Sequence, residues 1–330
     1  MRYFGSKASV SGAVLDLVGE HVVTGSFCDP FGGIGTVGAA AKERGFRAFC
    51  GDHLAFAHAF QVARVESQRL PRFAGLRESG IYGADDLREA LNATPGIDGW
   101  LVREYAVKRR FFTRSNAERI EATRTRINVW QDAGLITRRE RAVLLASLIN
   151  SADRVANTAG TYYSHLKHWD RKALLAWRFD WVMPAPGQAG CRALLADAAT
   201  LAGRQRWDVL YLDPPYNARA HGAYYHLPET FAKGGEPLVA GKAGVPQGPS
   251  QRSDFCSPRR ALSALEGLLA ASRFGLLVFH YAEHGIISLA DLRRTLSAHG
   301  ALQEYVLAAP GYTTRSRRRV VNHHVFAVHG

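Results

Sequence analysis

Apolar residues near the N-terminus and in the later half of the chain form short runs that end in a carboxylate. These runs are residues 26–29, 47–52 and 209–213, and each is bounded by turn residues. Such runs are typical of strands buried on both faces. The alanine-rich residues 36–44 lie between the first two runs and stop before Gly45, which predicts a helix with a glycine cap. A strand, a helix and a strand in this order predict a parallel α/β sheet with a right-handed crossover.

The C-terminal part of the chain continues this alternation. Residues 276–281 are apolar and predict a strand, residues 289–298 have helical periodicity, and residues 320–328 predict a final strand. We therefore expect one sheet to be built from both ends of the chain.

The middle of the chain has a helical pattern instead. Ile120, Ile127 and Trp130 mark one face of a helix, and Thr137 with Glu140 has the form of a capping box before a second one. Residues 233–258 are rich in glycine and proline, which predicts a long functional or mobile loop. We expect three parts: residues 1–74 and 191–330 as the two halves of the α/β core, and residues 75–190 as a helical insertion.

A glycine-rich turn follows the first predicted strand. Its sequence is Asp29-Pro30-Phe31-Gly32-Gly33-Ile34-Gly35, and its glycines allow the backbone to approach a ligand closely. Asp52 ends the next strand, 23 residues after Asp29. This is close to the offset of about 20 residues at which an acidic residue binds ribose hydroxyls in nucleotide-binding folds. The alternatives are a tight connection for the turn and a solvated strand end for Asp52.

The strongest local signal is Asp213-Pro214-Pro215-Tyr216, which follows an apolar strand. It therefore falls at the carboxyl end of the sheet, where α/β folds bind ligands. The Asp213 carboxylate and a backbone carbonyl of the prolines can accept both hydrogens of an amino group conjugated to a base. Such acceptors favour a nucleophilic nitrogen and stabilise its developing positive charge during methyl transfer. Tyr216 offers an aromatic face on which an extruded base could stack.

Composition narrows the class of protein further. The chain has 42 basic and 29 acidic residues and a formal net charge of +13, which favours a polyanionic partner such as nucleic acid. The histidines lack paired ligand spacing, His323-His324 is expected to be a strand or surface pair, and we expect no metal. The sequence has neither an apolar run long enough to span a membrane nor a secretory signal, so we expect a cytoplasmic protein.

Together these motifs resemble the adenine-N6 DNA methyltransferases of the alpha group, the Dam-like enzymes. Residues 2–7 are similar to the family's N-terminal cofactor motif, residues 29–35 to its glycine motif and residues 213–216 to its catalytic motif, in the same order. The resemblance is nearest to the branch of methyltransferases that accompany FokI-type restriction enzymes. Its pattern is echoed in three further stretches: Phe111-Phe112-Thr113, residues 157–162, and Tyr216-Asn217 with Tyr225-His226-Leu227.

The resemblance implies a seven-stranded methyltransferase-type Rossmann sheet whose helical insertion recognises the target in double-stranded DNA. It implies S-adenosylmethionine as cofactor and a flipped-out adenine as substrate, in a restriction-modification or host or phage DNA modification system with a cognate endonuclease encoded separately. Asp197 resembles the family's adenosine-contacting carboxylate, although an ordinary solvated turn is the alternative. The implied cofactor positions are Tyr3, Lys7, Asp29, Phe31, Gly32, Gly33, Gly35, Asp52, Asp197 and Asp213.

Basic and polar segments outside these motifs are candidates for DNA contact. Two basic runs could hold phosphates, and the segment 157–167 carries groups able to reach base edges. The alternatives are solvated faces for the runs and a corner held by its own hydrogen bonds for the segment. The candidate residues are Lys108, Arg109, Arg110, Asn157, Tyr162, Lys167, Arg315, Arg317 and Arg318.

Two departures from the branch and three competing functions stay open. The branch usually has Ser-Tyr-Asn or Ser-Tyr-Ser where this chain has Phe279-His280-Tyr281, and Glu-Thr-Ile where it has Glu229-Thr230-Phe231. RNA adenine or the N4 amino group of cytosine could use the same acceptors. A DNA-binding module with an inactive core is the third competitor, and the presence of Asp213 weighs against it. The recognition sequence and the oligomeric state cannot be inferred from the sequence.

Overall fold

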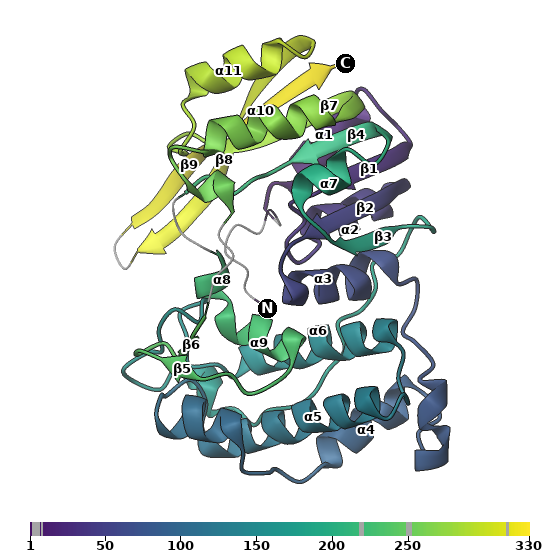
Figure 1. Cartoon of the computed structure of the whole chain (residues 1–330), viewed down its shortest axis with the longest axis vertical. Coiled ribbons are helices and arrows are strands. Elements are labelled where there is room, and N and C mark those ends of the chain that lie inside the picture. The colour runs from purple at the N-terminus through teal and green to yellow at the C-terminus, as the bar shows by residue number, and fades with distance from the viewer. Residues whose placement is uncertain (2–6, 8, 218–220, 249–252, 315–316) are drawn as a thin grey trace. The chain divides into compact units, whose positions relative to one another are not determined.

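A seven-stranded sheet is the centre of one of the two units into which the computed structural model divides the chain (Figure 1). The structure describes residues 1, 7, 9–217, 221–248, 253–314 and 317–330, and the side chains of all these except 221, 308–314 and 317–321. The sheet unit comprises Ser6–His53, Ala185–Ala220 and Arg252–Gly330. The helical unit comprises Met1–Gly5, Leu54–Pro184 and His221–Gln251.

The strand order of the large sheet is β3-β2-β1-β4-β7-β9-β8, which confirms the predicted seven-stranded α/β fold. The first five strands of this order are parallel, and β9 runs antiparallel between β7 and β8. The strands are β1 (Gly25–Asp29), β2 (Phe46–Asp52), β3 (Arg192–Leu195), β4 (Arg206–Leu212), β7 (Arg273–Ala282), β8 (Ala301–Thr314) and β9 (Arg317–His329). The sequence did not single out β3 or β8, because edge strands expose polar residues and lack a continuous apolar run.

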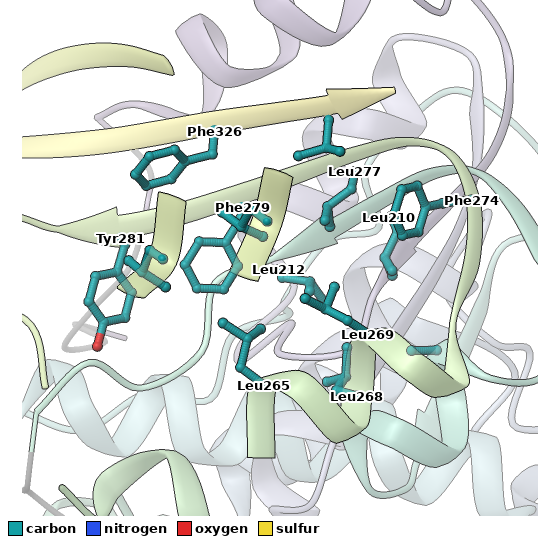
Figure 2. Close-up of a cluster of buried hydrophobic side chains, with 14 of the residues drawn as sticks. Leu210, Leu212, Leu265, Leu268, Leu269, Phe274, Leu277, Phe279, Tyr281 and Phe326 are labelled. Carbon is teal, nitrogen blue, oxygen red and sulfur yellow. The ribbon is translucent and has the colours of Figure 1, made fainter. Parts of the chain in front are cut away.

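Apolar side chains cover both faces of this sheet. On β4, Val209 and Tyr211 pack on one face, and Leu210 and Leu212 on the other, as the alternation of side chains along a strand requires. Figure 2 shows the second face, where Leu265, Leu268 and Leu269 pack against the sheet. Helices α1 (Ser11–Gly19) and α2 (Thr36–Glu43) cover the first face, and α7 (Ala198–Ala202), α10 (Ala261–Ala271) and α11 (Leu289–Ser297) the second; a 3₁₀ turn spans Asp254–Cys256.

The helical unit is built around two long antiparallel neighbours, α5 (Arg114–Asp132) and α6 (Arg138–Arg154). The expected capping box is present, because Thr137 and Glu140 bond each other's backbone N–H groups. The other helices are α3 (Ala55–Gln61), α4 (Ala84–Ala93), α8 (His221–Tyr224) and α9 (His226–Lys233). Shorter elements are π turns at Val62–Glu66 and Val102–Val107, 3₁₀ turns at Ala74–Ser79 and Arg171–Leu174, and a two-stranded ribbon of β5 (Val239–Ala240) and β6 (Val245–Pro246).

The boundaries of the helical unit differ from the predicted insertion of residues 75–190. The unit begins at Leu54, ends this stretch at Pro184 and adds His221–Gln251. The reason is packing, because α3 lies against α6 and α9, and the sequence pattern of a helix does not reveal its partners. Among the described residues, no helix is both long and apolar enough to cross a membrane.

Candidate active site

Three carboxylates meet at one edge of the sheet. Asp29 and Asp52 are the last residues of β1 and β2, and Asp213 directly follows β4. Since β2, β1 and β4 are parallel neighbours, their carboxyl ends lie together. Asp29 is 1% exposed, and the side chain of Asp213 is 13% exposed. The edge predicted from local strand signals is therefore assembled as expected.

Lys7 anchors one oxygen of this group. Its Nζ lies 2.7 Å from Asp213 Oδ2 and 5.3 Å from the centroid of the Tyr216 ring. The lysine side chain is 6% exposed, so the pair is shielded from water. A buried ion pair that would be costly to break fixes the orientation of the Asp213 carboxylate.

The other oxygen of Asp213 is a buried acceptor without a donor. Neither Asp213 Oδ1 nor Asp29 Oδ1 has a hydrogen-bond partner among the described residues. Burial raises the pKa of Asp213, and Lys7 partly opposes this shift. Burial, followed by the charge of Asp213, raises the pKa of Asp29 well above its ordinary value. Because unfilled buried acceptors destabilise a fold, both oxygens point to a ligand that brings donors or positive charge.

The glycine turn is tied to the end of the neighbouring strand. Gly32 N donates to Gly51 O over 2.9 Å, and Gly33 N donates to the Asp52 carboxylate over 3.2 Å. Gly33 and Gly35 have φ angles of 49° and 74°, in the region that favours glycine. The turn therefore holds the backbone beside Asp52 and leads directly into α2.

The remaining implied cofactor positions have separate settings. Phe31 packs edge to face on Phe255, with ring centroids 5.0 Å apart. Asp197 is exposed after β3, and its Oδ1 accepts from Ala199 N over 2.9 Å as the N-cap of α7. That bond gives Asp197 a structural role and leaves its contact with adenosine a prediction. Tyr3 lies outside the described residues.

Tyr216 lies between Lys7 and Tyr281, whose ring centroid is 5.9 Å away in an edge-to-face arrangement. Its carbonyl oxygen accepts from Ile286 N over 3.0 Å, which secures the segment after the two prolines. Burial, followed by the charge of Asp213, raises the pKa of Tyr216 to about 12. The phenol is therefore neutral at pH 7, as a stacking surface for a base requires.

Arg109 is not a free phosphate ligand, although the sequence suggested that role. Its Nη1 donates to the carbonyl and the carboxylate of Glu104, and its Nε donates to Gly241 O over 3.0 Å. The side chain is 11% exposed. Lys108 is exposed and bonds the same carboxylate, whereas Arg110 is exposed. Of this basic run, Arg110 is best placed for phosphate contact.

Asn157 and Tyr162 also have inward roles. Asn157 is fully buried, and its amide donates to Arg110 O and Leu166 O and accepts from Asp170 N. Tyr162 is 2% exposed and stacks on Phe111 with centroids 6.0 Å apart. These side chains shape the corner of residues 157–170 and cannot reach base edges from their buried positions.

The corner itself presents other groups outward. Tyr163 is 60% exposed and packs beside Tyr224, with ring centroids 5.4 Å apart. Lys167 is half-exposed on the same segment and stays a candidate. Arg315 lies outside the described residues, and the side chains of Arg317 and Arg318 do as well.

Glu229 is a functional neighbour whose role the sequence did not reveal. Its Oε1 and Oε2 accept from Ala55 N and Phe56 N over 3.2 and 3.1 Å. The carboxylate thereby caps the start of α3, the helix that follows Asp52 by two residues. Only a tertiary contact supplies this cap, because the two partners are 174 residues apart.

A parallel sheet with one reversed strand, a glycine turn and carboxylates after β1, β2 and β4 define a methyltransferase-type α/β protein. The chain matches the family of D12 class N6 adenine-specific DNA methyltransferases over residues 3–264, and it belongs to this family. The resemblance drawn from the motifs is therefore confirmed.

The chain is similar to three restriction-modification methyltransferases. It is 29% identical to the type II methyltransferase M.FokI of Planomicrobium okeanokoites over 92% of this chain and 48% of that protein. It is 28% identical to the modification methylase StsI of Streptococcus sanguinis over 90% of this chain and 46% of that protein. It is 29% identical to the type II methyltransferase M.NlaIII of Neisseria lactamica over 91% of this chain and 89% of that protein. The chain thus spans about half the length of the first two relatives.

S-adenosylmethionine is the cofactor expected of this methyltransferase family, and the residues present fit it. The unfilled acceptors Asp29 Oδ1 and Asp213 Oδ1 suit its positively charged groups. Asp52, held beside the glycine turn, suits its ribose hydroxyls.

Proposed function

We propose that this chain is a site-specific DNA methyltransferase that acts on the N6 amino group of a flipped-out adenine. The observation that carries the proposal is the Asp213 carboxylate, with Oδ2 fixed by Lys7 and Oδ1 buried without a donor. An amino group supplies the missing donor. Membership of the N6 adenine-specific family supports adenine as its source.

The geometry suggests how these residues act. Asp213 Oδ1 and a backbone carbonyl of Pro214 or Pro215 accept the two amino hydrogens and turn the nitrogen lone pair toward the methyl group. When bound, S-adenosylmethionine supplies that methyl group on a positively charged sulfur. The neutral Tyr216 ring holds the extruded base by stacking, which contributes about 1–3 kcal/mol. Asp213 stabilises the positive charge that develops on the nitrogen.

The biological setting belongs to the same proposal. Relatives named as type II methyltransferases support a restriction-modification role, with double-stranded DNA as substrate and a separately encoded endonuclease as partner. Such DNA is in the cytoplasm of a bacterium, where we place the protein.

The test is product analysis with an inactive variant as reference. The protein is incubated with unmethylated DNA and labelled S-adenosylmethionine, and the nucleosides are separated by mass spectrometry. We expect N6-methyladenine, and we expect Asp213→Asn to lower the single-turnover rate by about 10²–10³ at saturating cofactor. Asp16→Asn, an exposed carboxylate on α1, is the matched control and should stay active.

Other products decide between the competing functions. N4-methylcytosine, or label found only when RNA is supplied, would overturn the choice of substrate. DNA binding without any methyl transfer would identify an inactive core. Sequencing that maps the modified bases would then give the recognition site.

A further inference from the structure

Three ring side chains form a hydrogen-bonded row across neighbouring strands of the sheet. The hydroxyl of Tyr211 on β4 lies 3.0 Å from His280 Nδ1 on β7. His280 Nε2 lies 2.9 Å from His323 Nδ1 on β9. Tyr211 and His280 are 1% and 0% exposed, whereas His323 is half-buried. The row thus runs from the interior of the sheet unit toward its surface.

The inner end of the row lies beneath the catalytic carboxylates. Tyr211 precedes Asp213 by two residues, so both side chains project from the same face of β4. After burial, the charges of Asp213 and Asp29 raise the pKa of Tyr211 well above its ordinary value. His280 stands where the FokI-type branch usually has a tyrosine between serine and asparagine or serine.

The outer end of the row is open. The hydrogen bond to His280 uses His323 Nδ1, and its Nε2 has no partner among the described residues and is not a buried atom. The neighbouring His324 takes a separate course, because its Nδ1 lies 2.7 Å from Glu304 Oε1. The two histidines that the sequence suggested to be a simple pair therefore have different surroundings.

Both histidines of the row are neutral at pH 7. Burial, followed by the charge of Lys7, lowers the pKa of His280 well below its ordinary value and that of His323 to about 4. A neutral imidazole donates at one nitrogen and accepts at the other, and a tyrosine hydroxyl does both. Each member can therefore receive a proton on one side while it releases another on the opposite side.

We propose that Tyr211, His280 and His323 relay to solvent the proton that the target amino group loses in each methyl transfer. The proposal rests on the proposed function. The N–C bond forms as the C–S bond breaks, its electron pair stays on sulfur, and the nitrogen proton passes to the Asp213 carboxylate. From there the proton enters the row at Tyr211, and the His323 Nε2 proton leaves to water. The row shifts by one proton at each hydrogen bond, so charge balances and Asp213 is again a carboxylate.

The charged and titratable groups around the row agree with this direction. Asp29 and Asp213 face Tyr211, Lys7 acts on both histidines, and His324 acts on His323. Once Asp213 has given up its proton, the two carboxylates favour a Tyr211 hydroxyl that points its hydrogen toward them. His280 then donates to Tyr211, and His323 donates to His280, which is the arrangement left by one outward transfer.

The test compares the first turnover with later turnovers. His280→Gln and His323→Gln keep hydrogen-bonding side chains but remove the imidazole that exchanges protons. Because Asp213 accepts the first proton directly, we expect the first turnover to be within about twofold of wild type. We expect steady-state turnover to fall about tenfold, since general acid–base groups commonly contribute 10²–10³ or more and this one acts through another. His324→Gln, the adjacent residue on β9, is the matched control.

A solvent isotope effect separates a relay from a structural role. Steady-state turnover of the glutamine variants should become slower in D₂O, and a high concentration of a small buffer should restore part of the rate. Equal losses in the first and later turnovers, or steady-state turnover like wild type in both variants, would overturn the relay. His323→Gln keeps the test decisive if His280→Gln does not fold, because His323 is half-buried. If wild-type protein forms no N6-methyladenine, the proposed function fails, and the relay is not the cause.

Discussion

At the scale of single residues, the active edge of the sheet contains buried charge that the fold does not neutralise. Asp29 illustrates this best, because its Oδ1 lacks a partner among the described residues and its carboxyl is 1% exposed. Phe31 N–H is a donor that lowers its pKa, but burial and the charge of Asp213 outweigh it. Residues that bind a charged ligand commonly reduce the stability of the ligand-free protein.

Asp29→Asn should therefore stabilise the protein while weakening cofactor binding. The pKa of Asp29 is higher in the folded than in the unfolded protein, so the wild type loses stability as pH rises above about 4. The variant lacks this loss, and we expect it to gain about 1 kcal/mol or more at pH 7. Urea unfolding at pH 4 and pH 7 measures the effect, and calorimetry measures binding of S-adenosylmethionine. A variant no more stable than wild type at pH 7 would contradict the argument.

Lys7 should set the pH range of activity. It lowers the pKa of Asp213 against the effect of burial, and methyl transfer requires the charged carboxylate. Lys7→Met should therefore move the acidic limb of the rate profile to higher pH by about one unit or more. Lys7→Arg keeps the charge and should shift the limb less. Single-turnover rates between pH 5 and pH 9 measure this, and an unmoved limb in Lys7→Met would show that the ion pair does not control Asp213.

At the scale of elements, side chains of the helical unit hold the backbone of the glycine-rich segment after α9. Trp100 Nε1 donates to Pro237 O, Arg124 Nη1 to Gly235 O and Arg109 Nε to Gly241 O. The hydroxyl of Tyr105 also donates to Gly244 O. The segment that the sequence suggested to be a long mobile loop thus has a defined backbone path between residues 234 and 248.

Arg109 and Arg110 should consequently behave differently when neutralised. Arg110→Gln should reduce the salt dependence of DNA binding by a slope of about 0.9, the value for one lost phosphate contact. Arg109→Gln should leave that slope unchanged and speed amide exchange around Gly244, because the bond to Gly241 is lost. Titrations at several salt concentrations and hydrogen exchange measure the two effects. Equal slopes for the two variants would refute the distinction.

At the scale of the whole molecule, the net charge of +13 should dominate binding to DNA of unrelated sequence. Each phosphate that a lysine or arginine neutralises releases bound counterions, so affinity falls steeply with salt. If six or more phosphates are contacted, affinity should fall about 10³-fold or more between 50 and 200 mM salt. Fluorescence titration with a non-cognate duplex measures this dependence. A slope near zero would mean that the positive charge is a solvated surface.

The sequence by itself determined the elements that carry the chemistry. Asp29, Asp52 and Asp213 could be placed because each ends or follows an apolar strand, and parallel strands bring their carboxyl ends together. The glycine turn and the capping box of α6 were also legible, since both depend on neighbours a few residues away. Periodicity shows that a face is buried, and local motifs show where an element begins or ends.

The tertiary structure alone decided which groups meet. The pairing of Lys7 with Asp213 joins residues far apart in sequence, as do the Glu229 cap of α3 and the bond of Tyr211 to His280. Burial turned Arg109, Asn157 and Tyr162 from candidate DNA contacts into supports of the backbone. A side chain's role depends on its partners and on its access to water, and the folded chain sets both by bringing distant segments together.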